Sequence, residues 1–100
     1  MDRKYSQDEL MEMLSNVVDP ETGVDVVNLG LIYFVSQEED RVNIRYTLTS
    51  PYCPLEEYMH TEIVKQIETS TGLKCEAKLV WEPMWSAEMI SEGARLALGI

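Results

Sequence analysis

Near the start of the chain, apolar residues recur at the spacing of an amphipathic helix. Residues 6–9 (SQDE) match a capping box, in which the serine and the glutamate side chains each accept a hydrogen bond from the other residue's backbone amide. One apolar stripe follows, made of Leu10, Met13, Leu14 and Val17. The pattern predicts a helix that begins at Ser6 and ends at Asp19-Pro20, because the residue before a proline is pushed out of the helical region.

Two stretches typical of β-strands come next. Residues 24–35 are rich in β-branched and aromatic side chains and predict a first strand, within which Gly30 indicates a bulge or a close approach of the backbone. From Arg41 to Thr49, apolar and polar residues alternate, which predicts a second strand that pairs antiparallel with the first and has one wet face. The predicted wet face carries Arg41, Asn43, Arg45 and Thr47.

The second half of the chain predicts a helix, a strand and a helix. Pro54 suits the first position of a helix, where its missing amide hydrogen costs nothing, and Gly72 suits the C-terminal cap. The buried stripe of this helix is predicted to be Leu55, Met59, Ile63 and Ile67. A third strand is expected over residues 74–81, followed by a last helix over residues 86–98 that is capped by its first serine and closed by Gly99.

The predicted order of elements is helix, strand, strand, helix, strand, helix. A strand-helix-strand step that returns to the same sheet makes the second and third strands parallel. We therefore expect an α/β two-layer sandwich with a three-stranded mixed sheet, of the Fe-S cluster assembly domain type once the resemblance below is considered. One hundred residues supply material for one core, so residues 1–100 are expected to form a single domain.

Acidic residues outnumber basic ones, 18 to 8, which gives a formal net charge of −10. This charge repels phosphate backbones and anionic lipid headgroups, so nucleic acid is not expected as a partner, and a basic protein or a metal cation suits the field better. No apolar run approaches the roughly 20 residues that cross a bilayer, and the N-terminus lacks the apolar core of a signal peptide. We expect no membrane partner and a cytoplasmic location.

The two cysteines, Cys53 and Cys75, have no C-x-x-C spacing. They form neither a disulfide framework nor a self-sufficient zinc site, so both are expected to be reduced thiols. Cys53 directly precedes Pro54 and is expected at the N-cap of the second helix, where unpaired amides and the helix dipole favour a thiolate. Because thiolates attack electrophiles and bind soft metals, Cys53 is the candidate functional residue and the candidate metal ligand. The alternative is a small apolar filler at a helix start.

Oxygen-bearing side chains occur close to this cysteine and in the first turn. Thr49 and Ser50 end the second strand, and they either hydrogen-bond a thiolate or a ligand or cap the strand end. Asp19 and Glu21 flank a proline, and they either supply hard oxygen ligands or order the loop. Taken alone, this spacing favours the turn-forming role.

The remaining candidates favour structural roles. His60 lies seven positions after Cys53, about 10 Å along a helix, which is too far for a hydrogen bond, so we expect an exposed histidine and no catalytic pair. The chain is accordingly not expected to be an enzyme. Cys75 is expected to be a buried core thiol, and Trp81 and Trp85 a packing lid over the sheet edge, with a docking patch as the alternative.

Four segments match, in order, the signatures of one family. They are DPE at 19–21, VNLGLIY at 27–33, TLTSPYCP at 47–54 and LVWEPMWS at 79–86. With these segments the chain resembles the SufT and PaaD-like metal-sulfur cluster assembly family over about residues 10–99. The resemblance implies an accessory factor that helps to deliver or insert iron-sulfur clusters into client proteins.

The resemblance also implies the residues of the site and the partners. The family's functional residues carry over to Asp19, Glu21, Thr49, Ser50 and Cys53. Tyr52 departs from the family pattern, because many relatives carry glycine at this position. The implied partners are iron-sulfur cluster assembly proteins and client apoproteins.

We expect transient handling of iron or a cluster by Cys53, combined with protein docking. Iron-sulfur clusters usually need four thiolates and this chain offers two, so no tightly bound cofactor is expected. A site shared across a homodimer or completed by a client stays open. Two rival readings remain: a metal-free adaptor for the maturation of a multicomponent oxygenase, and a small thiol-dependent enzyme.

Overall fold

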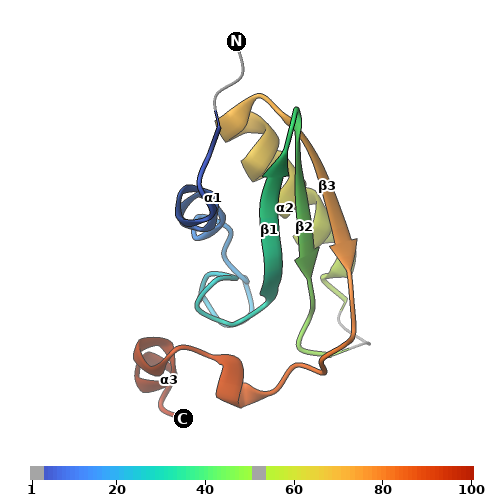
Figure 1. Ribbon diagram of the computed structural model, residues 1–100. Helices are drawn as coiled ribbons and strands as arrows, with labels where there is room; N and C mark the ends of the chain where they lie inside the picture. Colours follow the sequence, from blue (N-terminus) through green and yellow to red (C-terminus); the bar gives the residue numbers. More distant parts are fainter. Residues whose placement is uncertain (1–3, 51–53) are drawn as a thin grey trace.

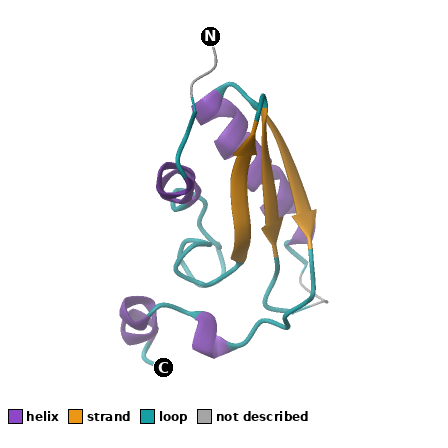
Figure 2. Ribbon diagram, viewed as in Figure 1, coloured by secondary structure: helices purple, strands orange, loops and turns teal. Residues whose placement is uncertain are grey.

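Three strands form one mixed sheet, and the helices α1 and α2 pack on one of its faces (Figures 1 and 2). The computed structural model describes residues 4–50 and 54–100. Strand β1 (Ile32–Glu38) pairs antiparallel with β2 (Arg41–Tyr46), which pairs parallel with β3 (Lys74–Leu79). The predicted α/β two-layer fold with a three-stranded mixed sheet is confirmed.

Helix α1 (Gln7–Leu14) begins at the predicted capping box, with Ser6 Oγ accepting from the Glu9 amide and Glu9 Oε1 accepting from the Ser6 amide. The helix ends at Leu14, so the prediction that it continues to Asp19 is wrong. The backbone amide of Val26 donates to the carbonyl of Val17, and an isolated bridge joins residues 18 and 25. The chain therefore leaves the helix because these residues pair across a turn.

The strand predicted over residues 24–35 starts later, at Ile32. Residues 25–30 instead form a turn, in which the carboxylate of Asp25 accepts from the Asn28 amide and the carbonyl of Asp25 accepts from the Leu29 amide. The expected close approach at Gly30 is confirmed: its φ is +75°, and a Cβ there would lie 2.3 Å from the carbonyl oxygen of Met89. A register shift between Ile32 and residue 34 adds an irregularity at the start of β1.

Helix α2 (Glu56–Thr71) has Leu55 as its N-cap, so the expected start at Pro54 with Cys53 at the N-cap is wrong. The carbonyl of Leu55 accepts the first helical hydrogen bond, from Met59, and the Leu55 side chain packs against the core from this cap position. With Leu55 partly buried at the cap, the helix starts two residues later than the position of the proline alone indicates. The predicted left-handed C-cap at Gly72 is confirmed, with a φ of +74°.

Beyond β3, which ends at Leu79 and not at residue 81, the single helix predicted over residues 86–98 is two elements. A short 3₁₀ helix, η1 (Ala87–Met89), precedes α3 (Glu92–Leu98). Ile90 between them is extended and buried, and the Ser91 amide donates to the carbonyl of Asn28. This long-range bond interrupts the helix, and Ser91 becomes the cap of α3 by accepting from the Ala94 amide.

The core lies between the sheet and the helices α1 and α2. Its fully buried members include Leu10, Leu14, Val35, Val42, Ile44, Tyr46, Ile63 and Ile67. The predicted stripes of α1 and α2 thus supply the core. Thr47, expected on the wet face of β2, is buried, because the strand ends at Tyr46 and the Thr47 amide donates to the carbonyl of Leu31. Among the helices of the described residues, none is long and apolar enough to cross a bilayer.

Candidate functional site

A pocket lies where the chain leaves the carboxyl ends of β2 and β3. Because these strands run parallel, the segments that follow them emerge at the same edge of the sheet (Figure 1). The pocket has a volume of about 320 Å³ and is lined by Leu48, Thr49, Ser50, Trp81, Met84 and Trp85. We refer to these six residues as the strand-end pocket. It brings two hydroxyls of the predicted site together with four large apolar side chains.

The wall of the strand-end pocket is attached to distant parts of the chain. The indole nitrogen of Trp85 donates to the carbonyl of Leu29 at 2.8 Å, and the hydroxyl of Tyr33 donates to the carbonyl of Pro83 at 2.8 Å. Trp85 also packs against the core, so the packing role predicted for Trp81 and Trp85 together is confirmed for Trp85. Trp81 is 41% exposed and Met84 is 81% exposed, so the outer part of this wall presents apolar surface to solvent.

Thr49 and Ser50 are positioned by the end of β2. Thr49 is exposed and Ser50 is partly buried, and both line the strand-end pocket. Cys53, with Pro51 and Tyr52, lies outside the described residues, so its predicted thiolate character and metal contact remain predictions. In the sequence, Cys53 follows the pocket residue Ser50 by three positions and directly precedes Pro54.

The structure gives Asp19 a turn-forming role. Its side chain is largely buried, and Asp19 Oδ1 accepts from the Glu21 amide at 2.8 Å. The Asp19 carbonyl also accepts from the Gly23 amide at 2.8 Å, while the Glu21 side chain is exposed. Within the described residues, no hydrogen bond or ion pair joins Asp19 or Glu21 to Thr49. The grouping of these carboxylates with Thr49 and Ser50 in one site, which the family resemblance implies, therefore stays a prediction.

Within residues 4–50 and 54–100, no group of three or more histidine, cysteine, aspartate or glutamate side chains is arranged to hold a metal ion. A metal site that includes Cys53 lies outside these ranges.

His60 is exposed, as expected, but it has a partner that sequence reasoning missed. Its Nδ1 lies 3.1 Å from the hydroxyl of Tyr46, with the ring centroids 6.1 Å apart. Burial, and secondly the charge of Glu56, raise the pKa of Tyr46 to about 12. The alternating pattern of β2 placed Tyr46 in the core, but no local signal indicates which helical residue its hydroxyl reaches.

Cys75 is buried, which confirms the predicted core thiol. Burial raises the pKa of this thiol to about 12, with smaller contributions from the charges of Glu68 and Glu76. Its backbone amide donates to Glu68 Oε2 at 3.0 Å. The thiol is therefore protonated at neutral pH and is a poor ligand for soft metals.

Comparison with known proteins places the chain in a family. The family model described as "Iron-sulfur cluster assembly protein" matches residues 7–79. The Fe-S protein maturation auxiliary factor YitW of Bacillus subtilis is 43% identical over 96 residues, which cover 94% of each chain. The Fe-S protein maturation auxiliary factor SufT of Staphylococcus aureus is 39% identical over 90 residues, covering 84% of this chain and 98% of the relative.

The fold of a solved relative agrees with this assignment. The crystal structure of a domain of unknown function, DUF59, from Bacillus anthracis matches with a TM-score of 0.89 and 39% sequence identity, covering 94% of this chain and 92% of that one. The resemblance predicted from the four sequence segments is thus confirmed by both sequence and structure. The chain belongs to the iron-sulfur cluster assembly protein family.

Proposed function

We propose that the protein is a cytoplasmic accessory factor in the assembly of iron-sulfur clusters or in their delivery to client proteins, and that Cys53 is the residue that contacts iron or the cluster. The observation that carries the proposal is the similarity to two Fe-S protein maturation auxiliary factors over most of the chain. The strand-end pocket supports it, because Thr49 and Ser50 line this pocket and precede Cys53 by only a few positions.

The available thiols favour a transient role over permanent storage. A cluster is usually held by four thiolates, and this chain has two cysteines. Burial keeps the Cys75 thiol out of contact with solvent and raises its pKa, so this thiol stays protonated. Cys53 is then the one thiolate that this chain contributes, and the remaining ligands come from a client, an assembly protein or a second copy. No catalytic step is part of the proposal.

The exposed apolar wall of the strand-end pocket supports a docking role as well. Trp81 and Met84 present apolar surface beside the hydroxyls of Thr49 and Ser50. Such surface at the mouth of a pocket is typical of sites where a partner binds. A client that binds Trp81 and Met84 brings its own ligands to the end of the sheet at which Thr49 and Ser50 lie, a few positions before Cys53 in the sequence.

The experiment is anaerobic reconstitution with ferrous iron and sulfide, followed by measurement of bound iron and visible absorbance. The matched pair of variants is Cys53→Ser and Cys75→Ala, each of which removes one thiol. We expect Cys53→Ser to lose most of the iron that the wild type binds, and Cys75→Ala to retain it. Circular dichroism checks that both variants are folded. Equal iron in the wild type and in Cys53→Ser overturns the metal role of Cys53.

A second candidate function, a metal-free docking adaptor, is favoured by the exposure of Trp81 and Met84. Cys53→Ser and a further variant, Trp81→Ala/Met84→Ala, distinguish it when they are assayed for activation of a client apoprotein. An adaptor keeps full activity in Cys53→Ser and loses it in Trp81→Ala/Met84→Ala. A cluster-handling factor loses activity in Cys53→Ser.

A further inference from the structure

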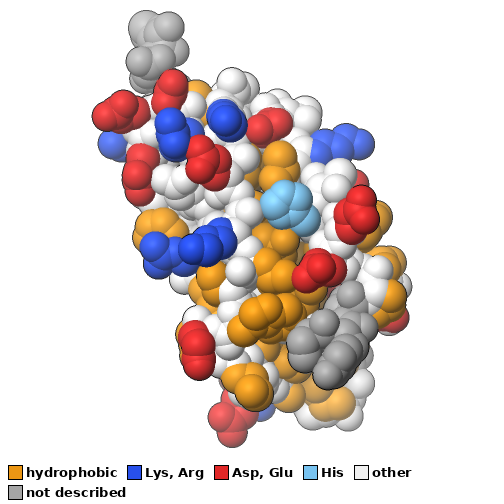
Figure 3. Space-filling view, turned by 90° about the vertical axis from the view of Figure 1, so that its right-hand side faces the viewer, with side chains coloured by type: hydrophobic (Ala, Val, Ile, Leu, Met, Phe, Trp, Pro, Cys, Tyr) orange, Lys and Arg blue, Asp and Glu red, His pale blue; other side chains and the backbone are white. Residues whose placement is uncertain are grey.

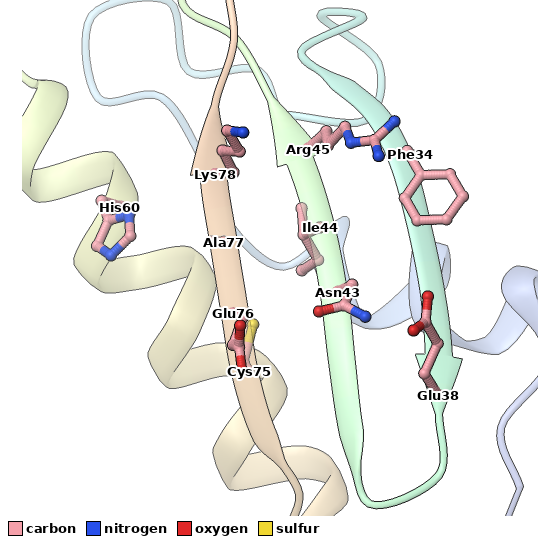
Figure 4. Close-up of a pocket in the computed structure, with 10 residues that line it drawn as sticks. All are labelled: Phe34, Glu38, Asn43, Ile44, Arg45, His60, Cys75, Glu76, Ala77 and Lys78. Atoms are coloured by element: carbon pink, nitrogen blue, oxygen red, sulfur yellow. The ribbon is translucent and has the colours of Figure 1, made fainter.

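The face of the sheet opposite the helices carries three rows of side chains that follow the strand register. We call this surface the outer face. From the hairpin end to the strand-end pocket, the rows are Glu38–Arg41–Lys74, Ser36–Asn43–Glu76 and Phe34–Arg45–Lys78. Figure 4 shows most of these side chains, with Arg45 directed toward the Phe34 ring and Lys78 on the neighbouring strand.

Charge is unevenly distributed over these rows. In the two rows near the hairpin, two acidic and two basic residues balance, and Arg41 Nη1 pairs with Glu76 Oε1 at 2.8 Å. The third row holds Arg45 and Lys78 without an acidic member. In the described ranges, no carboxylate lies within ion-pair distance of either cation. The guanidinium carbon of Arg45 lies 5.2 Å from the centre of the Phe34 ring.

This row departs locally from the charge of the rest of the chain. The chain carries 18 acidic residues and only 8 basic ones, yet Arg45 and Lys78 are register partners on adjacent strands and their row has no acidic member. Arg45 extends toward the Phe34 ring, so the row presents two cationic side chains beside an aromatic one. An anionic partner with an apolar side chain is complementary to this row.

A groove continues from this row toward the strand-end pocket. It has a volume of about 620 Å³, and its lining includes Phe34, Arg45, Val80, Trp81, Glu82 and Pro83. Phe34 is 37% exposed and Trp81 is 41% exposed. Arginine and exposed aromatic side chains are enriched at protein interfaces. Figure 3 shows lysine and arginine side chains next to hydrophobic ones on the side of the molecule that carries β3.

We propose that an acidic segment of a partner protein, carrying an aliphatic or aromatic side chain, docks on the Phe34–Arg45–Lys78 row and extends along the groove to Trp81. Its acidic groups pair with Arg45 and Lys78, and its apolar side chain packs between Phe34 and Trp81. Glu82 is the single carboxylate among the residues that line the groove, and it is not part of the cationic row. That the partner is a client or an assembly protein rests on the proposed function.

A peptide fits this surface better than a nucleic acid does. The cationic row spans one pair of residues, whereas the rest of the chain carries a strong excess of negative charge. A short segment senses mainly the charges within a Debye length, about 8 Å at physiological ionic strength. A long phosphate backbone extends over the acidic surroundings and is repelled by them.

The test measures binding of a fluorescein-labelled, glutamate-rich peptide with one leucine and one phenylalanine, by fluorescence anisotropy at low salt. The test variant is Arg45→Glu/Lys78→Glu, and the matched control is Lys4→Glu/Lys65→Glu, which makes the same charge change at two exposed lysines elsewhere. We expect the test variant to bind at least about tenfold more weakly and the control to stay within about twofold of wild type. A milder pair, Arg45→Gln/Lys78→Gln, covers the case in which charge reversal unfolds the sheet.

The proposal is overturned if the wild type does not bind the peptide, or if Arg45→Glu/Lys78→Glu and Lys4→Glu/Lys65→Glu weaken binding equally. It is also overturned if a peptide with glutamine in place of glutamate binds as tightly as the glutamate-rich one. Tighter binding of a single-stranded oligonucleotide than of the peptide overturns it too. Iron loading of Arg45→Glu/Lys78→Glu separates this proposal from the proposed function. Failure of cluster handling appears as equal iron in the wild type and Cys53→Ser, whereas failure of docking appears in the peptide titration.

Discussion

The hydroxyl of Tyr46 lies 3.1 Å from Nδ1 of His60 and joins the end of β2 to the first turns of α2. Tyr46 is buried and His60 is exposed, so the bond crosses from the core to the surface. In the sequence, Thr49, Ser50 and Cys53 lie between Tyr46 and His60. The pair therefore joins the two elements that precede and follow these site residues in the chain.

Replacing Tyr46 by phenylalanine removes this bond and leaves the ring in place. We expect the free energy of unfolding to fall by about 1 kcal/mol, because a buried hydrogen bond contributes roughly that amount. Urea denaturation followed by circular dichroism measures the change. Tyr58→Phe is the matched control, since Tyr58 is 45% exposed and the chemical change is the same. Equal effects of the two substitutions contradict a role for the Tyr46–His60 bond.

Alkaline pH is expected to destabilise the protein. Burial raises the pKa of Tyr46 from 10.0 to about 12, and burial raises that of Cys75 from 9.0 to about 12. Both values are higher in the folded state than in the unfolded state. The contribution of these two protonated groups to the free energy of unfolding is therefore fully present below pH 9, and it is lost as the pH rises toward 12. Urea midpoints measured across this range should fall, and they should fall less in Tyr46→Phe/Cys75→Ala. An unchanged slope in the double variant argues against this linkage.

Two glycines with the same φ allow the steric effect of the close approach at Gly30 to be separated from the cost of the left-handed backbone conformation. Gly23 and Gly30 both have a φ of +75°, but only Gly30 is crowded, by the carbonyl of Met89. Gly23→Ala should lower the free energy of unfolding by about 1 kcal/mol, the cost of a left-handed alanine. Gly30→Ala should cost at least about 2 kcal/mol more, because the η1 segment has to move. Similar urea midpoints for the two variants contradict the steric argument.

Cys75 should resist alkylation in the native protein. In Cys53→Ser it is the sole thiol, so mass spectrometry after iodoacetamide treatment reports on this residue alone. Burial and the raised pKa predict a rate at least about a hundredfold lower than in denaturant. A native rate close to that of free cysteine shows that the thiol is accessible, which removes the reason for excluding it as a metal ligand.

The local sequence pattern was sufficient to predict the order of the elements, the mixed sheet and the apolar stripes that form the core. The capping box at Ser6 and the left-handed caps at Gly72 and Gly99 depend only on neighbouring residues, so they could be placed correctly from the sequence. Alternation along β2 likewise identified Val42 and Ile44 as buried. These features follow from the 3.6- and 2-residue periods of helices and strands.

The errors occur where long-range contacts override the local pattern. The predicted last helix breaks because Ser91 bonds to Asn28, and the predicted first strand starts late because Asp25 caps a turn. The strand-end pocket was missed as a unit for the same reason. Thr49 and Trp81 were each noted, but they come together only through the parallel pairing of β2 with β3.

The wall of the strand-end pocket is anchored by contacts with a segment that lies outside the pocket. The indole of Trp85, the carbonyl of Pro83 and the backbone of Met89 are seated on residues 29–33, whereas Trp81 and Met84 point outward between these attachments. Substitutions at Trp81 and Met84 alter exposed side chains and leave the anchoring bonds of Trp85 and Pro83 in place. If a client docks on these two side chains, as proposed, a library confined to them changes client binding while the domain stays folded.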